Sequence, residues 1–140
     1  MSVPMTFAQA AITSALAETG ATLDAVFACG HHANGKPPLN IADHAWRKPN
    51  PGMIVAAAEQ MKLDLAHSWI AGDPASDHAA GKAAGLAGGI LISPRADGAE
   101  RVAAMQLRSE EFAVDVASSL ADAVSLLLAR SRLTIRMSAP

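Results

Sequence analysis

Hydrophobic and polar positions along the chain follow two different periods. Some segments carry apolar residues at helical spacing, and shorter apolar runs between them have the length of buried strands. The expected helices occupy residues 5–19, 51–63, 76–84, 97–106 and 119–131, and the expected strands occupy residues 24–29, 68–73, 88–93 and 112–117. Because parallel strands need crossover connections, this alternation predicts an α/β fold, Rossmann-like and three-layered, with a parallel sheet of about four strands.

Composition narrows the class of protein. The chain has 140 residues, 51% of them hydrophobic, and a net charge of −2. This content can build a core, so we expect one domain over residues 1–140, with residues 129–140 as a loose tail. The charge indicates no nucleic-acid partner, and no apolar run has the length of a membrane span. Cys29 is the only cysteine, and no secretory signal is evident, so we expect a cytoplasmic protein.

Two cations precede the second expected helix, in the segment RKPNPGM. Arg47 and Lys48 lie at the less favourable end of that helix, since the helix dipole favours cations at the C-terminus. Their position suggests an anion held between the lysine and the helix amides. The alternative is that both side chains are ordinary solvated surface.

Two carboxylates lie four residues apart in the segment GDPASDHAAG, one after a strand and one at a helix start. Ligands of parallel α/β sheets bind at the carboxyl ends of the strands, and Mg²⁺ prefers oxygen ligands. We therefore interpret Asp73 and Asp77 as a metal-binding pair that faces a small phosphorylated molecule. The alternative is that Asp73 and Asp77 only cap the helix, for which Ser76 or Asp77 is the expected cap residue. His78 is expected on the helix surface or in a cap, with no further role.

A long polar loop follows the first expected strand and contains Cys29, His31, His32 and His44. Long loops in compact domains are usually functional or held by a metal, and sulfur with imidazole is typical of zinc. Three ligands are evident where a tetrahedral site needs four, and Asp43 is a candidate for the fourth. Histidines scattered on a solvated loop are the alternative.

With RKPNPGM followed by IAGDPASDHAAGKAAGL, the chain resembles the haloacid dehalogenase (HAD) superfamily, and within it the heptose-bisphosphate and histidinol-phosphate phosphatases. The resemblance covers about residues 5–128. It implies Mg²⁺-dependent hydrolysis of a phosphomonoester of a sugar phosphate or similar small metabolite, through a phosphoaspartate. It also implies that Lys48 contacts the phosphate, that Arg47 helps bind substrate, and that Asp73 ligates Mg²⁺ with support from Asp77.

The same resemblance implies zinc only in part. Many members of the superfamily carry a zinc loop before the lysine motif, of the form Cys-x-His and then Cys-x-Cys. Cys29 and His31 match its first half, and His32 is an alternative to His31. His44 and Trp46 stand where the two cysteines would be.

The sequence departs from the family pattern at its front. The family begins with a strand ending in Asp-x-Asp-Gly-Thr, whose first aspartate attacks phosphorus and whose second serves as general acid and base. This motif is absent here, and the only aspartate before the loop is Asp24. We therefore expect an N-terminally incomplete HAD core, which belongs either to a phosphatase or to a catalytically silent module whose exposed sheet edge pairs in a homodimer. The sequence does not identify the substrate.

Overall fold

The computed structural model describes residues 7–93 and 98–137, and the chain divides into two compact units, residues 1–30 and 31–140. The first unit contains helix α1 (Phe7–Glu18). Gly20 follows in the left-handed region, with φ of 83°, and its amide donates to the Ala17 carbonyl at 3.0 Å. Glycine adopts this conformation without a steric penalty, so it ends the helix as the sequence predicted.

The strand predicted at residues 24–29 does not form. A strand requires a neighbouring strand to complete its backbone hydrogen bonds, and a short apolar run does not reveal whether one is present. None of the strands in the described part of the chain pairs with this segment. The sheet of the described residues therefore has three strands rather than about four.

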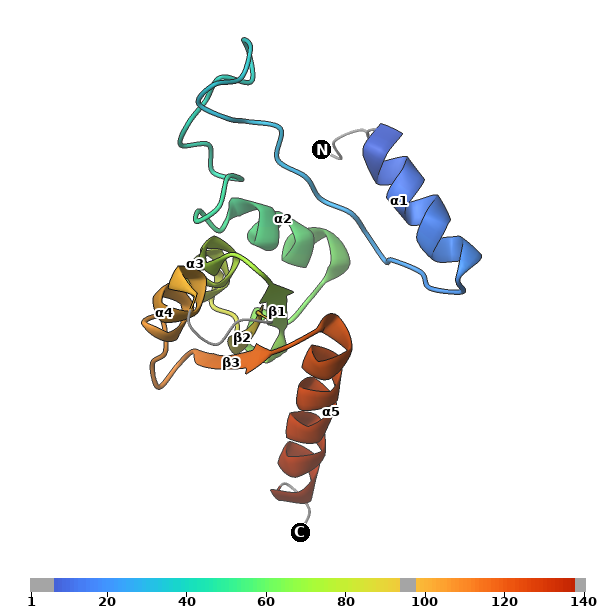
Figure 1. Cartoon of the computed structure of the whole chain (residues 1–140), viewed down its shortest axis with the longest axis vertical. Helices are drawn as coiled ribbons and strands as arrows, with labels where there is room; N and C mark the ends of the chain where they lie inside the picture. Colours follow the sequence, from blue (N-terminus) through green and yellow to red (C-terminus); the bar gives the residue numbers. More distant parts are fainter. Residues whose placement is uncertain (1–6, 94–97, 138–140) are drawn as a thin grey trace. The chain divides into compact units, whose positions relative to one another are not determined.

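The second unit is a parallel sheet with helices on both faces (Figure 1). Its strands are β1 (Trp69–Gly72), β2 (Gly88–Ile92) and β3 (Ala113–Ala117), in the spatial order β1-β2-β3. Its helices are α2 (Gly52–Met61), α3 (Ala75–Ala84), α4 (Ala99–Met105) and α5 (Leu120–Met137), with the short 3₁₀ helix η1 (Leu65–His67) before β1. This arrangement confirms the predicted α/β fold with a parallel sheet.

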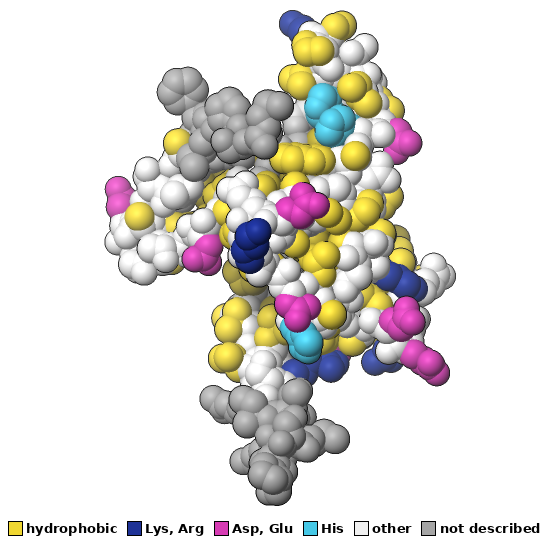
Figure 2. Space-filling model, turned by 180° about the vertical axis from the view of Figure 1, so that it is seen from behind, with side chains coloured by type: hydrophobic (Ala, Val, Ile, Leu, Met, Phe, Trp, Pro, Cys, Tyr) yellow, Lys and Arg dark blue, Asp and Glu magenta, His cyan; other side chains and the backbone are white. Residues whose placement is uncertain are grey.

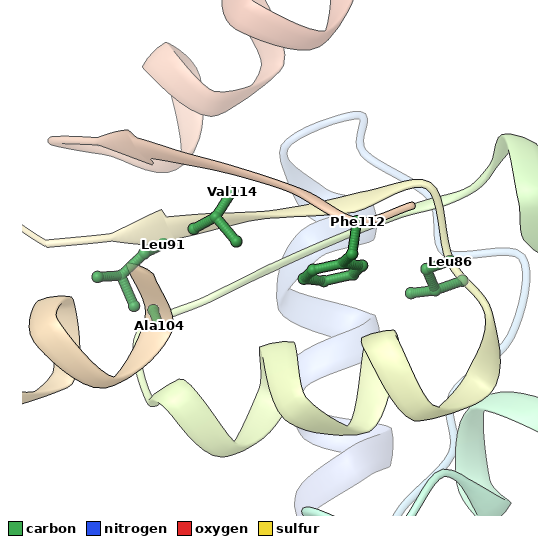
Figure 3. Close-up of a cluster of buried hydrophobic side chains, with 5 residues drawn as sticks. All are labelled: Leu86, Leu91, Ala104, Phe112 and Val114. Carbon is green, nitrogen blue, oxygen red and sulfur yellow. The ribbon is translucent and has the colours of Figure 1, made fainter. Parts of the chain in front are cut away.

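The core lies on both faces of this sheet, because successive strand residues point to opposite sides. On one face, strand residues pack against the layer of α3 and α4; the buried cluster is Leu86, Leu91, Ala104, Phe112 and Val114 (Figure 3). On the other face, Ile90 and Ala117 pack against Ala123 of α5. Two helical layers enclosing one sheet confirm the three-layer prediction.

Helix α5 is longer than predicted. The sequence pattern predicts that the helix ends at residue 131 and that residues 129–140 form a loose tail. In the structure the helix continues to Met137. No glycine or proline lies between Leu120 and Met137, so no residue in this segment breaks the helix. None of the described helices combines the length and apolar character needed to cross a membrane.

Candidate functional site

The carboxyl end of β1 and the first turn of α3 form what we call the acidic corner, residues 72–77. Asp73 directly follows β1 and is exposed. Asp77 lies in the first turn of α3, where its charge complements the helix dipole. Its carboxylate lies over Gly72, because a Cβ added there would approach it closer than 3.0 Å. Both predicted metal ligands therefore belong to the carboxyl end of β1, Asp73 by its position in the chain and Asp77 by the placement of its carboxylate.

Lys48 reaches the acidic corner from the segment before α2. Its Nζ donates to Oδ1 of Asp77, so residues 29 positions apart in sequence form an ion pair. The Asp77 side chain is only 14% exposed and that of Lys48 is 41% exposed. Partial burial reduces screening by water, so each charge holds the other more firmly than in a fully exposed pair.

The start of α3 is not capped as predicted. Pro74 is the N-cap residue and makes no side-chain cap, while Asp77 lies one turn further on and pairs with Lys48. The Ala75 amide instead donates to the carboxylate of Glu100, from α4. A local sequence pattern cannot reveal a cap supplied 25 residues away. Asp77 is therefore available for a role other than capping.

His78 is the residue of this region that the sequence interpretation misplaced. It is fully buried, with 0% of its surface exposed, rather than on the surface or in a cap. Its Nε2 lies 3.1 Å from the Gly72 carbonyl oxygen, and its ring lies against Gly89 of β2. The available signal was the Gly88-Gly89 pair in β2, which leaves room beside the strand for large rings of facing elements.

Arg47 is held by the loop that precedes it. Its Nη1 donates to the His31 carbonyl at 3.1 Å, and its backbone amide donates to the His44 carbonyl at 2.8 Å. The side chain of Lys48 thus contacts the acidic corner, whereas that of its neighbour Arg47 is hydrogen-bonded to the loop. Only one of the two predicted cations forms an ion pair with the acidic corner in the described structure.

Residues 31–46, which we call the histidine loop, do not have the geometry of a zinc site. The rings of His31 and His44 are stacked, with centroids 3.8 Å apart and planes 12° from parallel. Nitrogen lone pairs lie in the ring plane, so stacked rings do not direct them toward one ion. Among residues 7–93 and 98–137, no three His, Cys, Asp or Glu side chains gather as a metal-binding group.

Hydrogen bonds of the histidines also fail to fit zinc. The Nδ1 atom of His44 accepts from the Trp46 amide at 3.0 Å, and Nδ1 of His32 accepts from the Asn34 amide at 3.1 Å. A neutral imidazole with an accepting Nδ1 carries its proton on Nε2, which then has no lone pair for a metal. In this arrangement neither ring nitrogen of His32 or of His44 can bind a metal ion. These hydrogen bonds favour the other interpretation, in which the histidines belong to a solvated loop.

Asn50 closes the histidine loop. Its Nδ2 donates to Oδ1 of Asp43 at 2.8 Å and to the His44 carbonyl at 3.1 Å. Asp43, the candidate fourth zinc ligand, thus accepts a hydrogen bond from the Asn50 side chain. In the backbone, the Gly52 amide donates to the Ala45 carbonyl at 2.9 Å. Side-chain and backbone hydrogen bonds connect the loop to the start of α2.

The acidic corner fits Mg²⁺ better than the histidine loop fits zinc. Mg²⁺ is usually held by one or two carboxylates together with water and phosphate oxygens, and Asp73 and Asp77 supply two carboxylates at one strand end. The cation of Lys48 beside them would face the same phosphate.

A parallel α/β sheet with acids and a lysine at a strand end has the arrangement of a phosphoryl-transfer protein. Residues 45–123 match the profile of the HAD-hydrolase-like family. This match covers more than half of the chain, and the chain belongs to that family. The matched segment includes Lys48, Asp73 and Asp77.

Similar proteins indicate the branch of the HAD-like hydrolases to which this chain is related. The chain is 51% identical over 81 residues to the D-glycero-beta-D-manno-heptose-1,7-bisphosphate 7-phosphatase of Mesorhizobium japonicum, an alignment that covers 58% of this chain and 37% of that protein. It is 41% identical over 79 residues to the D-glycero-alpha-D-manno-heptose-1,7-bisphosphate 7-phosphatase of Burkholderia mallei, covering 56% of this chain and 42% of that protein.

A solved structure extends the likeness to the fold. The crystal structure of a protein described as a HAD-like phosphatase, from Mesorhizobium loti, matches with a TM-score of 0.68 and 39% sequence identity. The match covers 84% of this chain and 52% of that one. This chain therefore spans about half the length of that structure, and less than half of each curated relative is aligned.

Proposed function

We propose that this chain carries the Mg²⁺- and phosphate-binding part of a phosphatase that acts on a sugar phosphate such as a heptose bisphosphate. The observation that carries the proposal is the ion pair of Lys48 with Asp77, formed beside Asp73 at the end of β1. The printed activities of the similar proteins support the substrate class. A cytoplasmic location is part of the same proposal.

Each charged residue has a distinct role in this proposal. Asp73 and Asp77 hold Mg²⁺, which supplies charge neutralisation at the phosphoryl oxygens. The Lys48 ammonium moves from Asp77 to the phosphoryl group, where it stabilises negative charge of the transition state. Arg47, held through His31, contacts a second polar part of the substrate.

The attacking carboxylate is proposed to come from outside these 140 residues. The sequence holds no Asp-x-Asp-Gly-Thr motif. Strand β1 pairs only with β2 among the described strands, so its other edge can accept a further parallel strand. Such a strand would end beside Asp73 and deliver an aspartate to the acidic corner. We expect little turnover from the present chain alone.

The test is phosphate release from a heptose bisphosphate and a panel of other sugar phosphates, with Mg²⁺. The chain is compared with a version extended by an N-terminal Asp-x-Asp-Gly-Thr strand, and each is paired with Lys48→Ala and Asp73→Ala. The proposal predicts turnover only in the extended protein, and its loss in both variants. Turnover by the present chain that survives both substitutions would contradict it.

A second candidate is a catalytically silent module that associates with a second copy of itself. The open edge of β1 favours it, and so do hydrophobic side chains at the surface, as the space-filling view shows (Figure 2). On α5 these include Leu120, Val124 and Leu128, each at least 48% exposed. Light scattering distinguishes the candidates: a stable dimer without phosphatase activity in the extended protein supports the module, and an active monomer rules it out.

A further inference from the structure

We infer that His78 is a positioning residue, which holds the end of β1 and the start of α3 at the separation that a metal-binding acidic corner requires. The link to metal rests on the proposed function. The positioning itself rests on the buried contacts of the ring. No role for His78 follows from the sequence motifs, which concern the aspartates around it.

The hydrogen bond of His78 fixes its tautomer. The Gly72 carbonyl oxygen can only accept, so the Nε2 atom 3.1 Å away carries the proton and donates. Nδ1 is buried and finds no hydrogen-bond partner within the described structure. Among the described residues, the ring therefore makes a single hydrogen bond, to the carbonyl of the last residue of β1.

This bond acts on Asp73 through the peptide plane. The Gly72 carbonyl belongs to the same planar unit as the Asp73 amide, so holding the carbonyl fixes the direction in which the chain leaves β1. His78 is also the immediate neighbour of Asp77 on α3. One imidazole thus connects the backbone leading to the first aspartate with the helix that carries the second.

Gly89 keeps the ring in place from the other side. A Cβ added at Gly89 would approach Nδ1 of His78 closer than 3.0 Å, a separation that Cβ atoms essentially never show. The ring is fully buried, so it cannot move aside without displacing neighbouring atoms or leaving its position. Gly89→Ala should therefore displace the imidazole and break the bond to Gly72 without altering any group of the acidic corner.

The experiment uses the full chain and compares His78→Leu, which removes the donor, with His78→Gln, whose amide can donate from a position similar to Nε2. Ile90→Val is the matched control, since Ile90 packs against Ala117 and Ala123 on the face of β2 opposite to Gly89. Hydrogen exchange is followed in peptides covering residues 72–77. We expect faster exchange there in His78→Leu and Gly89→Ala, and near wild-type exchange in His78→Gln and Ile90→Val.

A measurement on the wild-type chain does not depend on whether the variants fold. The ¹⁵N shifts of His78 should report a protonated Nε2 and a bare Nδ1. A protonated Nδ1 with a bare Nε2 overturns the inference, and so does unchanged exchange of residues 72–77 in His78→Leu.

A Mg²⁺ titration of the same proteins separates this inference from the proposed function. Loss of one neutral hydrogen bond should weaken Mg²⁺ binding about three- to tenfold in His78→Leu, with most affinity recovered in His78→Gln. If exchange behaves as expected but no form binds Mg²⁺, the positioning role stands and the proposed function fails. If the wild-type chain and His78→Leu bind Mg²⁺ with equal affinity, His78 does not position the metal ligands.

Discussion

The acidic corner and the histidine loop differ in how their polar side chains are held, although the sequence suggested a metal site in both. In the acidic corner, Asp73 and Asp77 leave the ends of a strand and a helix that are packed against each other. In the histidine loop, His32 and His44 accept hydrogen bonds from backbone amides two residues away. Packed elements bring residues to the same strand end, whereas loop residues satisfy one another locally.

The difference suggests what a metal motif needs besides its residue types. The ends of packed elements fix the direction of a side chain before any ligand binds, which favours preorganised charge. Irregular backbone has its own unsatisfied groups, and nearby imidazoles can satisfy them.

The largest effect is expected on turnover. In the protein extended by an Asp-x-Asp-Gly-Thr strand, Lys48→Met should lower kcat on the order of 100- to 1000-fold, because a positioned cation at the phosphoryl group is lost. Lys36→Met, in the histidine loop, is the matched control and should leave kcat unchanged. Steady-state phosphate release measures both, and equal losses in the two variants would contradict a special role for the acidic corner.

Added methyl groups should separate the two regions by stability. Gly72→Ala places a Cβ against the Asp77 carboxylate, and Gly35→Ala places one 2.7 Å from the Leu39 carbonyl oxygen. We expect Gly72→Ala to lower the free energy of unfolding by about 1–3 kcal/mol, since the Asp77 carboxylate must turn away from the added methyl group and its ion pair with Lys48 is disturbed. Gly35→Ala should have a smaller effect because a loop can shift. Urea unfolding measures the free energy of unfolding of both variants. A larger loss in Gly35→Ala than in Gly72→Ala would contradict the prediction that the acidic corner is the more rigid region.

Removing the imidazole of His44 tests whether the histidine loop is held by stacking or by zinc. His44→Ala loses the stack on His31 and the hydrogen bond from the Trp46 amide. We expect a loss of stability of about 1 kcal/mol and no change in zinc content. Thermal unfolding and elemental analysis measure the two quantities. One zinc per wild-type chain that disappears in His44→Ala would restore the zinc prediction.

The smallest effect is expected at Asp64, outside both regions. A hydrogen bond from His67 Nδ1 to Asp64 Oδ2, 2.7 Å long, is the main cause that lowers the pKa of the Asp64 carboxyl below its ordinary value. Because the folded pKa is depressed, the stabilisation is present above the unfolded pKa and is lost as the pH falls through the folded value. Asp64 is exposed, so the effect on stability is small.

Substituting His67 should return the pKa of Asp64 toward its ordinary value. An NMR titration of the Asp64 carboxyl in the wild-type chain and in His67→Ala measures the change. The acidic corner should be unaffected, and this can be followed at the Asp77 amide. A pKa of Asp64 that does not rise in His67→Ala would exclude the hydrogen bond as its cause.

The sequence predicted most of the fold because local signals mark it. Gly85 ends α3 with φ of 86°, and apolar runs locate β1, β2 and β3. The false strand at residues 24–29 shows the limit of this reasoning, since its pattern is apolar but none of the described strands pairs with it. The length of α5 was underestimated because basic residues near its end resemble a solvated tail.

The candidate site was predictable only where the chemistry lies in one short motif. GDPASD locates Asp73 and Asp77, and RKP locates Lys48, although their meeting depends on the packing of α2, α3 and β1. The burial of His78 was missed because it depends on Gly89 of β2, and the Gly88-Gly89 pair indicates space beside that strand without showing which side chain fills it. The Glu100 contact at the start of α3 was hidden for the same reason.

A Mg²⁺ titration of the full chain followed by amide NMR, repeated with Asp73→Asn, tests most directly whether the acidic corner binds the metal. We predict that shifts concentrate at residues 72–77 and at Lys48, which pairs with Asp77, that they vanish in Asp73→Asn, and that residues 31–46 stay unperturbed. Shifts that concentrate in residues 31–46, or that persist unchanged in Asp73→Asn, would contradict this assignment.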